Sequence, residues 1–160
     1  YDTRIEDLIT YSGSAFSMVQ LDEARIRGAE FTGDVTLAGW ELSAQLSRTD
    51  PRNRSHHANE DNLLPRRAQI NGGFDLDRAF GAVRVGLTVN GAGYRYDELS
   101  NATRLAGFAT TDLRLEYAIN DAWTLLAKAD NVFDRQYETV AWYNQPGREY
   151  GVSLRYQPKR

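Results

Sequence analysis

The sequence alternates apolar and polar residues with a period of two in one stretch after another. Between Glu149 and Tyr156, the residues Tyr150, Val152 and Leu154 share one face with Tyr156, and polar residues and a glycine share the other. The same alternation recurs over residues 40–47, 83–90 and 112–119. Successive side chains of a β-strand point to opposite faces, whereas helical faces repeat about every 3.6 residues. The pattern therefore predicts an all-β fold whose strands have one apolar and one polar face.

The connections between these stretches alternate in length. Short turns are predicted at 38–39, 78–81 and 120–121, and long polar loops at 12–18, 50–62, 98–107 and 134–146. Strands joined by short turns pair in antiparallel fashion. We therefore expect about eight antiparallel strands, at residues 3–11, 19–37, 40–50, 63–77, 82–97, 108–119, 122–133 and 147–156.

Several of these strands exceed the roughly five or six residues that are usual in soluble sheets. Long strands with short turns at one end and long loops at the other are typical of a transmembrane β-barrel. Aromatic residues fit two interfacial girdles, with Trp40 and Trp123 after short turns and Tyr94 and Tyr150 near long loops. We therefore expect short periplasmic turns and long extracellular loops, with both chain ends at or leading to the periplasmic side.

Composition excludes several other classes of protein. The chain has no cysteine, which excludes a disulfide scaffold and a cysteine-ligated metal site. No apolar run approaches the roughly 18–20 residues of a membrane-spanning helix, and mean hydropathy is -0.58. The net charge of -3 comes without a basic block, so nucleic-acid binding is not expected.

Two alternatives to a segment of a larger barrel remain open on this evidence. One is a soluble β-sandwich with a wet face on each sheet. The other is a complete small barrel with a passive or structural role, in which residues 1–11 pair with residues 147–156.

Nothing in the sequence predicts catalysis. His56 and His57 are the only histidines, are adjacent, and lie in a polar run over 52–62 without a second pair of suitably spaced metal ligands. We therefore expect no enzyme activity, no catalytic residue, no metal site and no cofactor. Asn131 and Asp134 are expected to order a loop, because such side chains bond nearby backbone groups.

Three segments together resemble one family. Residues 130–137, with Asn131, Phe133, Asp134 and Tyr137, resemble a motif near the end of TonB-dependent outer-membrane receptors. Residues 24–30 and 64–68 resemble a strand and a loop-to-strand junction of the same family. Within the family, residues 138–140 and 147–150 are most similar to the cobalamin transporter subfamily.

The resemblance implies a barrel of about 22 strands whose lumen is filled by an N-terminal plug. Residues 1–160 are then expected to be a C-terminal barrel segment in a bacterial outer membrane, with the plug and the earlier strands absent. The implied function is active uptake of a large, scarce nutrient, with TonB contacting the absent plug. Cobalamin is the expected ligand, and an iron-siderophore complex is the alternative.

The resemblance also implies ligand contacts on the loop side. They are Tyr143 and Asn144 in the final loop, together with Arg66 or Arg67 at the junction before the fourth strand. A tyrosine ring suits a large amphipathic ligand, and arginine donates to amide and phosphate oxygens. The alternative is that Tyr143 is an ordinary rim aromatic and that the arginines pair with loop carboxylates.

The alternation also assigns the two faces of the wall. Leu113, Leu115, Val152 and Leu154 are expected to face lipid, and Arg114, Glu116 and Arg155 are expected to face the interior. The interior charges form either a salt-bridged wall or a solute path. Arg25 and Arg27 fall on the outward face at the outer headgroup level, where lipopolysaccharide phosphates or solvent would meet them.

Overall fold

The computed structural model describes residues 1–12, 17–56 and 58–158 and contains twelve β-strands over those residues. The strands are β1 (Asp2–Ser12), β2 (Ser17–Leu37), β3 (Trp40–Asn53), β4 (Ile70–Phe80), β5 (Val83–Ala92), β6 (Arg95–Tyr96), β7 (Arg104–Leu105), β8 (Phe108–Ala118), β9 (Trp123–Asp130), β10 (Glu138–Val140), β11 (Tyr143–Asn144) and β12 (Glu149–Tyr156). Among the described residues, no helix is long and apolar enough to cross a membrane.

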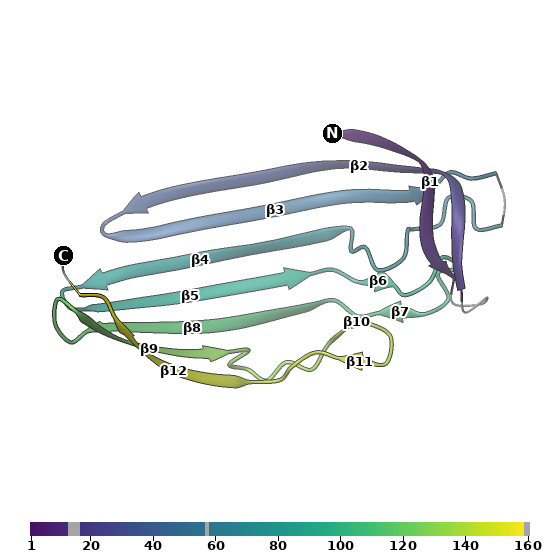
Figure 1. Cartoon of the computed structure of the whole chain (residues 1–160). Coiled ribbons are helices and arrows are strands. Elements are labelled where there is room, and N and C mark those ends of the chain that lie inside the picture. The colour runs from purple at the N-terminus through teal and green to yellow at the C-terminus, as the bar shows by residue number, and fades with distance from the viewer. Residues whose placement is uncertain (13–16, 57, 159–160) are drawn as a thin grey trace.

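Eight strands form one curved antiparallel sheet in the order β1-β2-β3-β4-β5-β8-β9-β12 (Figure 1). Two further pairs, β6 with β7 and β10 with β11, lie in the long connections. The all-β antiparallel prediction and the number of long strands are confirmed. A soluble β-sandwich is excluded because the long strands form one sheet and not two packed sheets.

Short turns lie at one end of the sheet and long loops at the other (Figure 1). Ala38 and Gly39 connect β2 to β3 with φ values of 51° and 81°. Positive φ at both central residues is the geometry that matches the twist of a two-residue hairpin. Gly81 supplies a positive φ of 61° in the turn between β4 and β5. The predicted alternation of short and long connections is therefore present.

The register confirms the predicted faces of the strands. Leu115 lies between Val85 and Ala127, whereas Glu116 lies between Arg84 and Leu126. On the polar face, Arg114 contacts Asp77 at 2.9 Å, Arg84 contacts Glu41 at 2.5 Å, and Arg155 contacts Glu116 at 3.7 Å. These ion pairs cross several strands and give the polar face a salt-bridged surface.

Strand boundaries differ from the prediction mainly at the fourth strand, which was expected over 63–77. β4 begins only at Ile70, because Leu63 and Leu64 turn inward and are buried near the loops. Arg66 follows Pro65 with a φ of 58°, a conformation that a regular strand does not contain. Likewise, β5 ends at Ala92 and not at residue 97.

The two chain ends lie at different levels of the sheet. Tyr1 was expected at or leading to the periplasmic side; its backbone pairs with Gly28, partway along β2, and β1 runs from there toward the loop end (Figure 1). β1 and β12 lie at opposite edges of the sheet, so the pairing of residues 1–11 with 147–156 is not formed within the described chain. Tyr156 pairs with Trp123 beside a short turn, as expected. Residues 13–16 of the predicted first loop, and Arg160, lie outside the described residues.

The buried core of the molecule lies at the loop end. Leu21, Ala24, Leu64 and Leu99 form an apolar cluster, against which Ile5, Leu8 and Ile26 pack. We use the name loop cap for the described residues of 54–69, 93–107 and 131–148. The loop cap, together with the loop ends of β1 and β2, is therefore the part of the described chain with a protein-like interior.

Candidate functional site

The carboxylate of Asp97 joins separate segments of the loop cap. Arg66 donates from Nε to Oδ1 of Asp97 at 2.9 Å and from Nη2 to Oδ2 at 3.4 Å. The backbone N–H of Ala141 donates to the same Oδ1 at 3.1 Å. Asp97 is only 8% exposed. One buried carboxylate therefore connects the three long connections that form the loop cap.

Arg66 extends this connection to the first hairpin. Its guanidinium carbon lies 5.2 Å from the centre of the Tyr11 ring, a distance at which a cation is attracted to an aromatic face. The backbone N–H of Arg66 donates to the carbonyl of Tyr96 at 2.6 Å. Arg66 is thus held by a carboxylate, a ring and a carbonyl.

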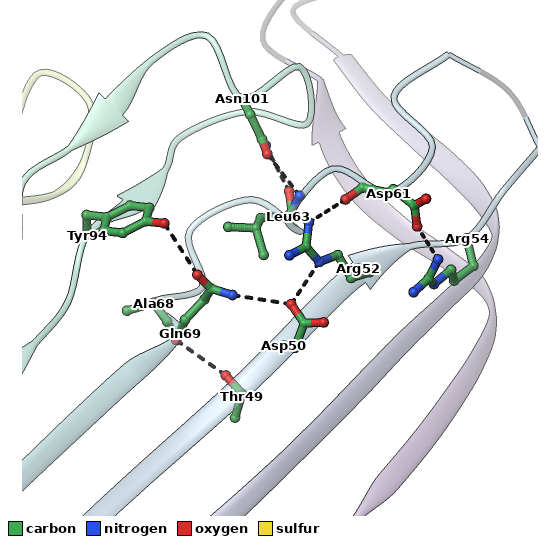
Figure 2. Close-up of polar contacts among 10 residues, drawn as sticks. All are labelled: Thr49, Asp50, Arg52, Arg54, Asp61, Leu63, Ala68, Gln69, Tyr94 and Asn101. Carbon is green, nitrogen blue, oxygen red and sulfur yellow. Dashed lines mark hydrogen bonds and ion pairs between the residues drawn. The ribbon is translucent and has the colours of Figure 1, made fainter.

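A second set of contacts fixes residues 61–69 (Figure 2). The side chain of Asn101 donates to the carbonyl of Leu63 at 2.9 Å and accepts from the Leu63 N–H at 2.9 Å. Gln69 donates to Asp50 at 3.2 Å and accepts from the Tyr94 hydroxyl at 3.4 Å. These bonds hold the junction before β4 in one conformation.

The same network reaches the top of β3 (Figure 2). Arg52 donates to Asp50 at 2.8 Å and to the carbonyl of Asp61 at 2.7 Å, and Arg54 pairs with the Asp61 carboxylate. Thr49 donates to the carbonyl of Ala68 at 3.4 Å. The loop between β3 and β4 is therefore anchored along its length to the strand it leaves.

A pocket of about 370 Å³ lies beneath this network, and its lining includes Ile26, Thr49, Arg66, Arg67, Asn71 and Arg95. Thr49 lies on the same face of β3 as Glu41, and Asn71 lies on the same face of β4 as Asp77. Because alternate residues of a strand share a face, the pocket opens on the ion-paired polar face of the sheet.

The structure places the predicted ligand residues in two groups. Arg66 and Arg67 both line the pocket, and the Arg66 guanidinium pairs with Asp97, as the carboxylate alternative predicted. Tyr143 and Asn144 form the short strand β11 and are exposed, Tyr143 to 68%. Tyr143 does not line the pocket of the arginines. The groups are linked through Asp97 and Ala141.

Sequence reasoning missed Asp97 and Arg95. Both were predicted to lie on a strand over 82–97, but β5 ends at Ala92. No spacing rule relates Asp97 to Arg66 or to Ala141, which are 31 and 44 residues away. The signal available was the run Arg95–Glu98, which is charged at three of four positions immediately after a strand.

Asn131 and Asp134 order the last loop, as predicted. Asn131 accepts from the N–H of Arg135 at 2.8 Å and donates to its carbonyl at 3.0 Å. Asp134 accepts from the N–H of Arg148 at 2.9 Å. A Cβ at Gly147 would lie 2.6 Å from the Asp134 carboxylate, so the loop requires glycine there. Residues 147–148 therefore have a structural role in this loop.

The outward arginines are paired within the chain. Arg25 donates to both carboxylate oxygens of Asp2, at 2.8 and 2.5 Å, and Arg27 lies 3.6 Å from the same carboxylate. Asp2 thus engages two donors of Arg25 and lies close to Arg27, the arginines that were considered as partners of lipopolysaccharide phosphates.

No group of three or more histidine or acidic side chains suited to a metal ion occurs within residues 1–12, 17–56 and 58–158. His56 pairs with Glu60 at 3.2 Å, and His57 lies outside the described residues.

Comparison with known proteins decides the family. Residues 1–132 match the model of the TonB dependent receptor-like β-barrel. The chain belongs to this family. It is a family of receptors and transporters whose β-barrels lie in the bacterial outer membrane, so the sheet is part of a transmembrane barrel wall. Because the polar face of such a wall lines the lumen, the arginine-lined pocket faces the interior.

Solved structures of this TonB-dependent receptor family resemble the whole described chain. The siderophore receptor PiuA from Acinetobacter baumannii matches with a TM-score of 0.80 and 16% identity over 97% of this chain and 25% of its own. The ferric yersiniabactin uptake receptor FyuA from Yersinia pestis matches with a TM-score of 0.78 and 20% identity, over 97% and 26%. The copper transporter OprC matches with a TM-score of 0.75 and 22% identity, over 96% of this chain and 26% of its own. The chain therefore spans about a quarter of the length of these receptors.

Proposed function

We propose that this chain is the C-terminal barrel segment of an outer-membrane receptor that takes up a ferric siderophore with energy delivered through TonB. In this proposal the strands supply part of the wall, and the loop cap supplies part of the extracellular ligand site. A plug domain elsewhere in the receptor contacts TonB and moves when the ligand passes.

The observation that carries the proposal is the arginine-lined pocket beneath the loop cap. Arg66, Arg67 and Arg95 line one hollow on the lumen face, directly below loops that Asp97 ties together. A ligand captured by the loops would meet this hollow on its way into the barrel. PiuA is a siderophore receptor and FyuA is a ferric yersiniabactin uptake receptor, which is consistent with such a ligand.

Cobalamin uptake is the second candidate, and the similarity of residues 138–140 and 147–150 to the cobalamin transporter favours it. In this chain, however, the N–H of Arg148 bonds Asp134, Gly147 leaves room for the same carboxylate, and Glu138 accepts from the N–H of Trp142 at 3.3 Å. These contacts order the loop whatever the ligand is, so the similarity does not by itself identify cobalamin. We therefore rank cobalamin second.

The proposal also assigns ligand contacts to Tyr143, Asn144, Arg66 and Arg67. Tyr143 and Asn144 present an exposed ring and an exposed amide at the outer rim, where first contact would occur. Arg67 presents an exposed guanidinium to the pocket. Capture at the rim followed by transfer to the pocket gives the two groups successive roles.

Uptake assays in the source bacterium test the proposal. Deleting the receptor gene should abolish accumulation of radiolabelled iron from at least one ferric siderophore, and collapse of the proton gradient should have the same effect in the parent strain. Uptake of labelled cyanocobalamin is measured in parallel. Loss of cyanocobalamin uptake with iron uptake intact would support the second candidate. Uptake that survives without TonB would contradict the energised mechanism.

A further inference from the structure

Arg95 is a buried cation without a polar partner. It lies on β6, is 8% exposed, and lines the lumen-side pocket. Its Nε and Nη2 atoms are buried and donate to no hydrogen-bond acceptor among the described residues. The guanidinium carbon lies 5.4 Å from the centre of the Phe108 ring, which is its only aromatic neighbour in the described chain.

Such an arrangement is unfavourable in the absence of an anion. Buried donors lose their hydrogen bonds to water, and a charge removed from water needs a counter-charge. Burial accordingly lowers the pKa of Arg95. Nearly all buried polar side chains in proteins are satisfied, so two unsatisfied nitrogens beside a pocket indicate an acceptor that comes from elsewhere.

The charged side chains that line the pocket are all cationic. Arg66, Arg67 and Arg95 contribute three cations to the lining, and no aspartate or glutamate lines it. Asp97 neutralises Arg66 from the side of the loops. Arg67 is exposed and has no ion-pair partner within the described residues. The hollow therefore keeps an excess of positive charge from Arg67 and Arg95.

We propose that this pocket binds an oxyanion group of the transported ligand, such as a carboxylate or a catecholate, with Arg95 as its deepest contact. The inference rests on the proposed function and adds the sign of the ligand's charge. Arginine suits this role because its planar fork presents parallel donors to paired oxygens. Arg67 would meet the same group from the exposed side. The pocket then favours acidic ferric siderophores over uncharged complexes and over cobalamin.

Binding to the purified full-length receptor tests this proposal. The probes are an anionic ferric tris-catecholate, an uncharged ferric tris-hydroxamate and cyanocobalamin. The variant Arg95→Gln should weaken binding of the anionic complex by roughly tenfold or more, because it truncates one partner of a buried charge pair. Binding of either uncharged probe should change by less than about twofold. Arg95→Lys keeps the charge without the fork and should fall in between.

The matched control is Arg25→Gln, because Arg25 is an arginine on the outward face that already pairs with Asp2. It should leave binding of all three probes unchanged. Heat-dependent gel mobility of each variant shows whether the barrel is folded. An oxyanion supplied by another segment of the receptor would give a different result: Arg95→Gln would lower the unfolding temperature without a charge-selective change in binding. That result, or equal binding of all probes, would overturn the proposal.

A further arm does not depend on the choice of siderophore. Sodium citrate, compared with sodium chloride at matched ionic strength, should raise the unfolding temperature of the wild-type receptor more than that of Arg95→Gln, beyond the general stabilisation that citrate gives both proteins. An equal rise in both would overturn the inference. If the wild type binds none of the iron complexes, the proposed function fails, and the citrate result still decides whether the pocket takes an oxyanion. No difference between the two salts would overturn the inference.

Discussion

The barrel wall and the loop cap are built from one chain on different principles. In the wall, alternate side chains face lipid and lumen, backbone pairing is regular, and neighbouring residues in space come from adjacent strands. In the loop cap, buried residues such as Leu64 and Leu99 come from different connections, and side chains bond backbone groups of distant segments. The wall takes its apolar environment from the membrane, whereas the loop cap supplies its own.

The difference shows where the molecule tolerates a change of charge. An ion pair of the wall, such as Arg155 with Glu116 at 3.7 Å, joins two half-exposed side chains, and such pairs contribute little. The bond between Arg66 and Asp97 involves a carboxylate whose side chain is only 11% exposed, so water replaces a lost partner poorly. A change of charge is therefore tolerated on the lumen face of the wall and not in the interior of the loop cap.

The largest expected effect comes from placing a charge on the lipid face of the wall. Leu115→Arg should destabilise the receptor by about 2–4 kcal/mol if the residue lies near the bilayer midplane. Glu116→Arg, one residue later and on the lumen face, should cost far less although it loses the contact with Arg155. Unfolding of the full-length receptor in lipid vesicles by denaturant measures both. Equal effects at the two positions would show that the assignment of faces is wrong.

A smaller effect is expected in the loop cap. Asp97→Ala removes the acceptor of the buried Ala141 N–H, and a buried donor left without a partner costs about 1–3 kcal/mol. It also removes the partner of Arg66, whose partly exposed guanidinium water can still reach. Limited proteolysis of the receptor should then cleave the loops faster while the wall stays resistant. Asp61→Ala is the matched control, because Asp61 is an exposed loop carboxylate whose side chain pairs, among the described residues, only with Arg54. If both variants are cleaved at the wild-type rate, Asp97 does not hold the loop cap together.

The smallest effect is expected at the rim. Tyr143 is exposed and has no side-chain hydrogen bond among the described residues, so Tyr143→Ala should leave the stability of wall and loop cap unchanged. Ligand binding should weaken by about 1 kcal/mol or more, as for a modest contact residue. Titration of the purified receptor with the ferric siderophore of the proposed function measures this. Unchanged binding by a correctly folded variant would remove Tyr143 from the ligand site.

The sequence predicted the wall well because one physical rule acts on it. Period-two alternation places Leu115 and Glu116 on opposite faces whatever the rest of the chain does, and positive φ at Ala38 and Gly39 follows from the hairpin they close. The level at which β1 begins along β2, with Asp2 opposite Arg27, could not be predicted, because parity within a strand does not reveal where along its neighbour the strand begins.

The loop cap could be predicted only in its local parts. Asn131 and Asp134 were found because they bond backbone groups of their own loop. Asp97 was missed because its partners, Arg66 and Ala141, come from two other loops, and no periodic rule relates the three residues. Arg66 was selected through family resemblance as a ligand contact, whereas its nearest charged partner is that carboxylate.

The long sequence separations within the loop cap also bear on the order in which contacts form as the chain folds. Leu37 and Trp40 can pair as soon as their turn forms, whereas Asn62 bonds the carbonyl of Leu99 across 37 residues and Ala141 bonds Asp97 across 44. Contacts between distant residues require larger loops to be closed and form later than local ones. We therefore expect the strands to pair first and the contacts of the loop cap to form last, on a template that the finished wall provides.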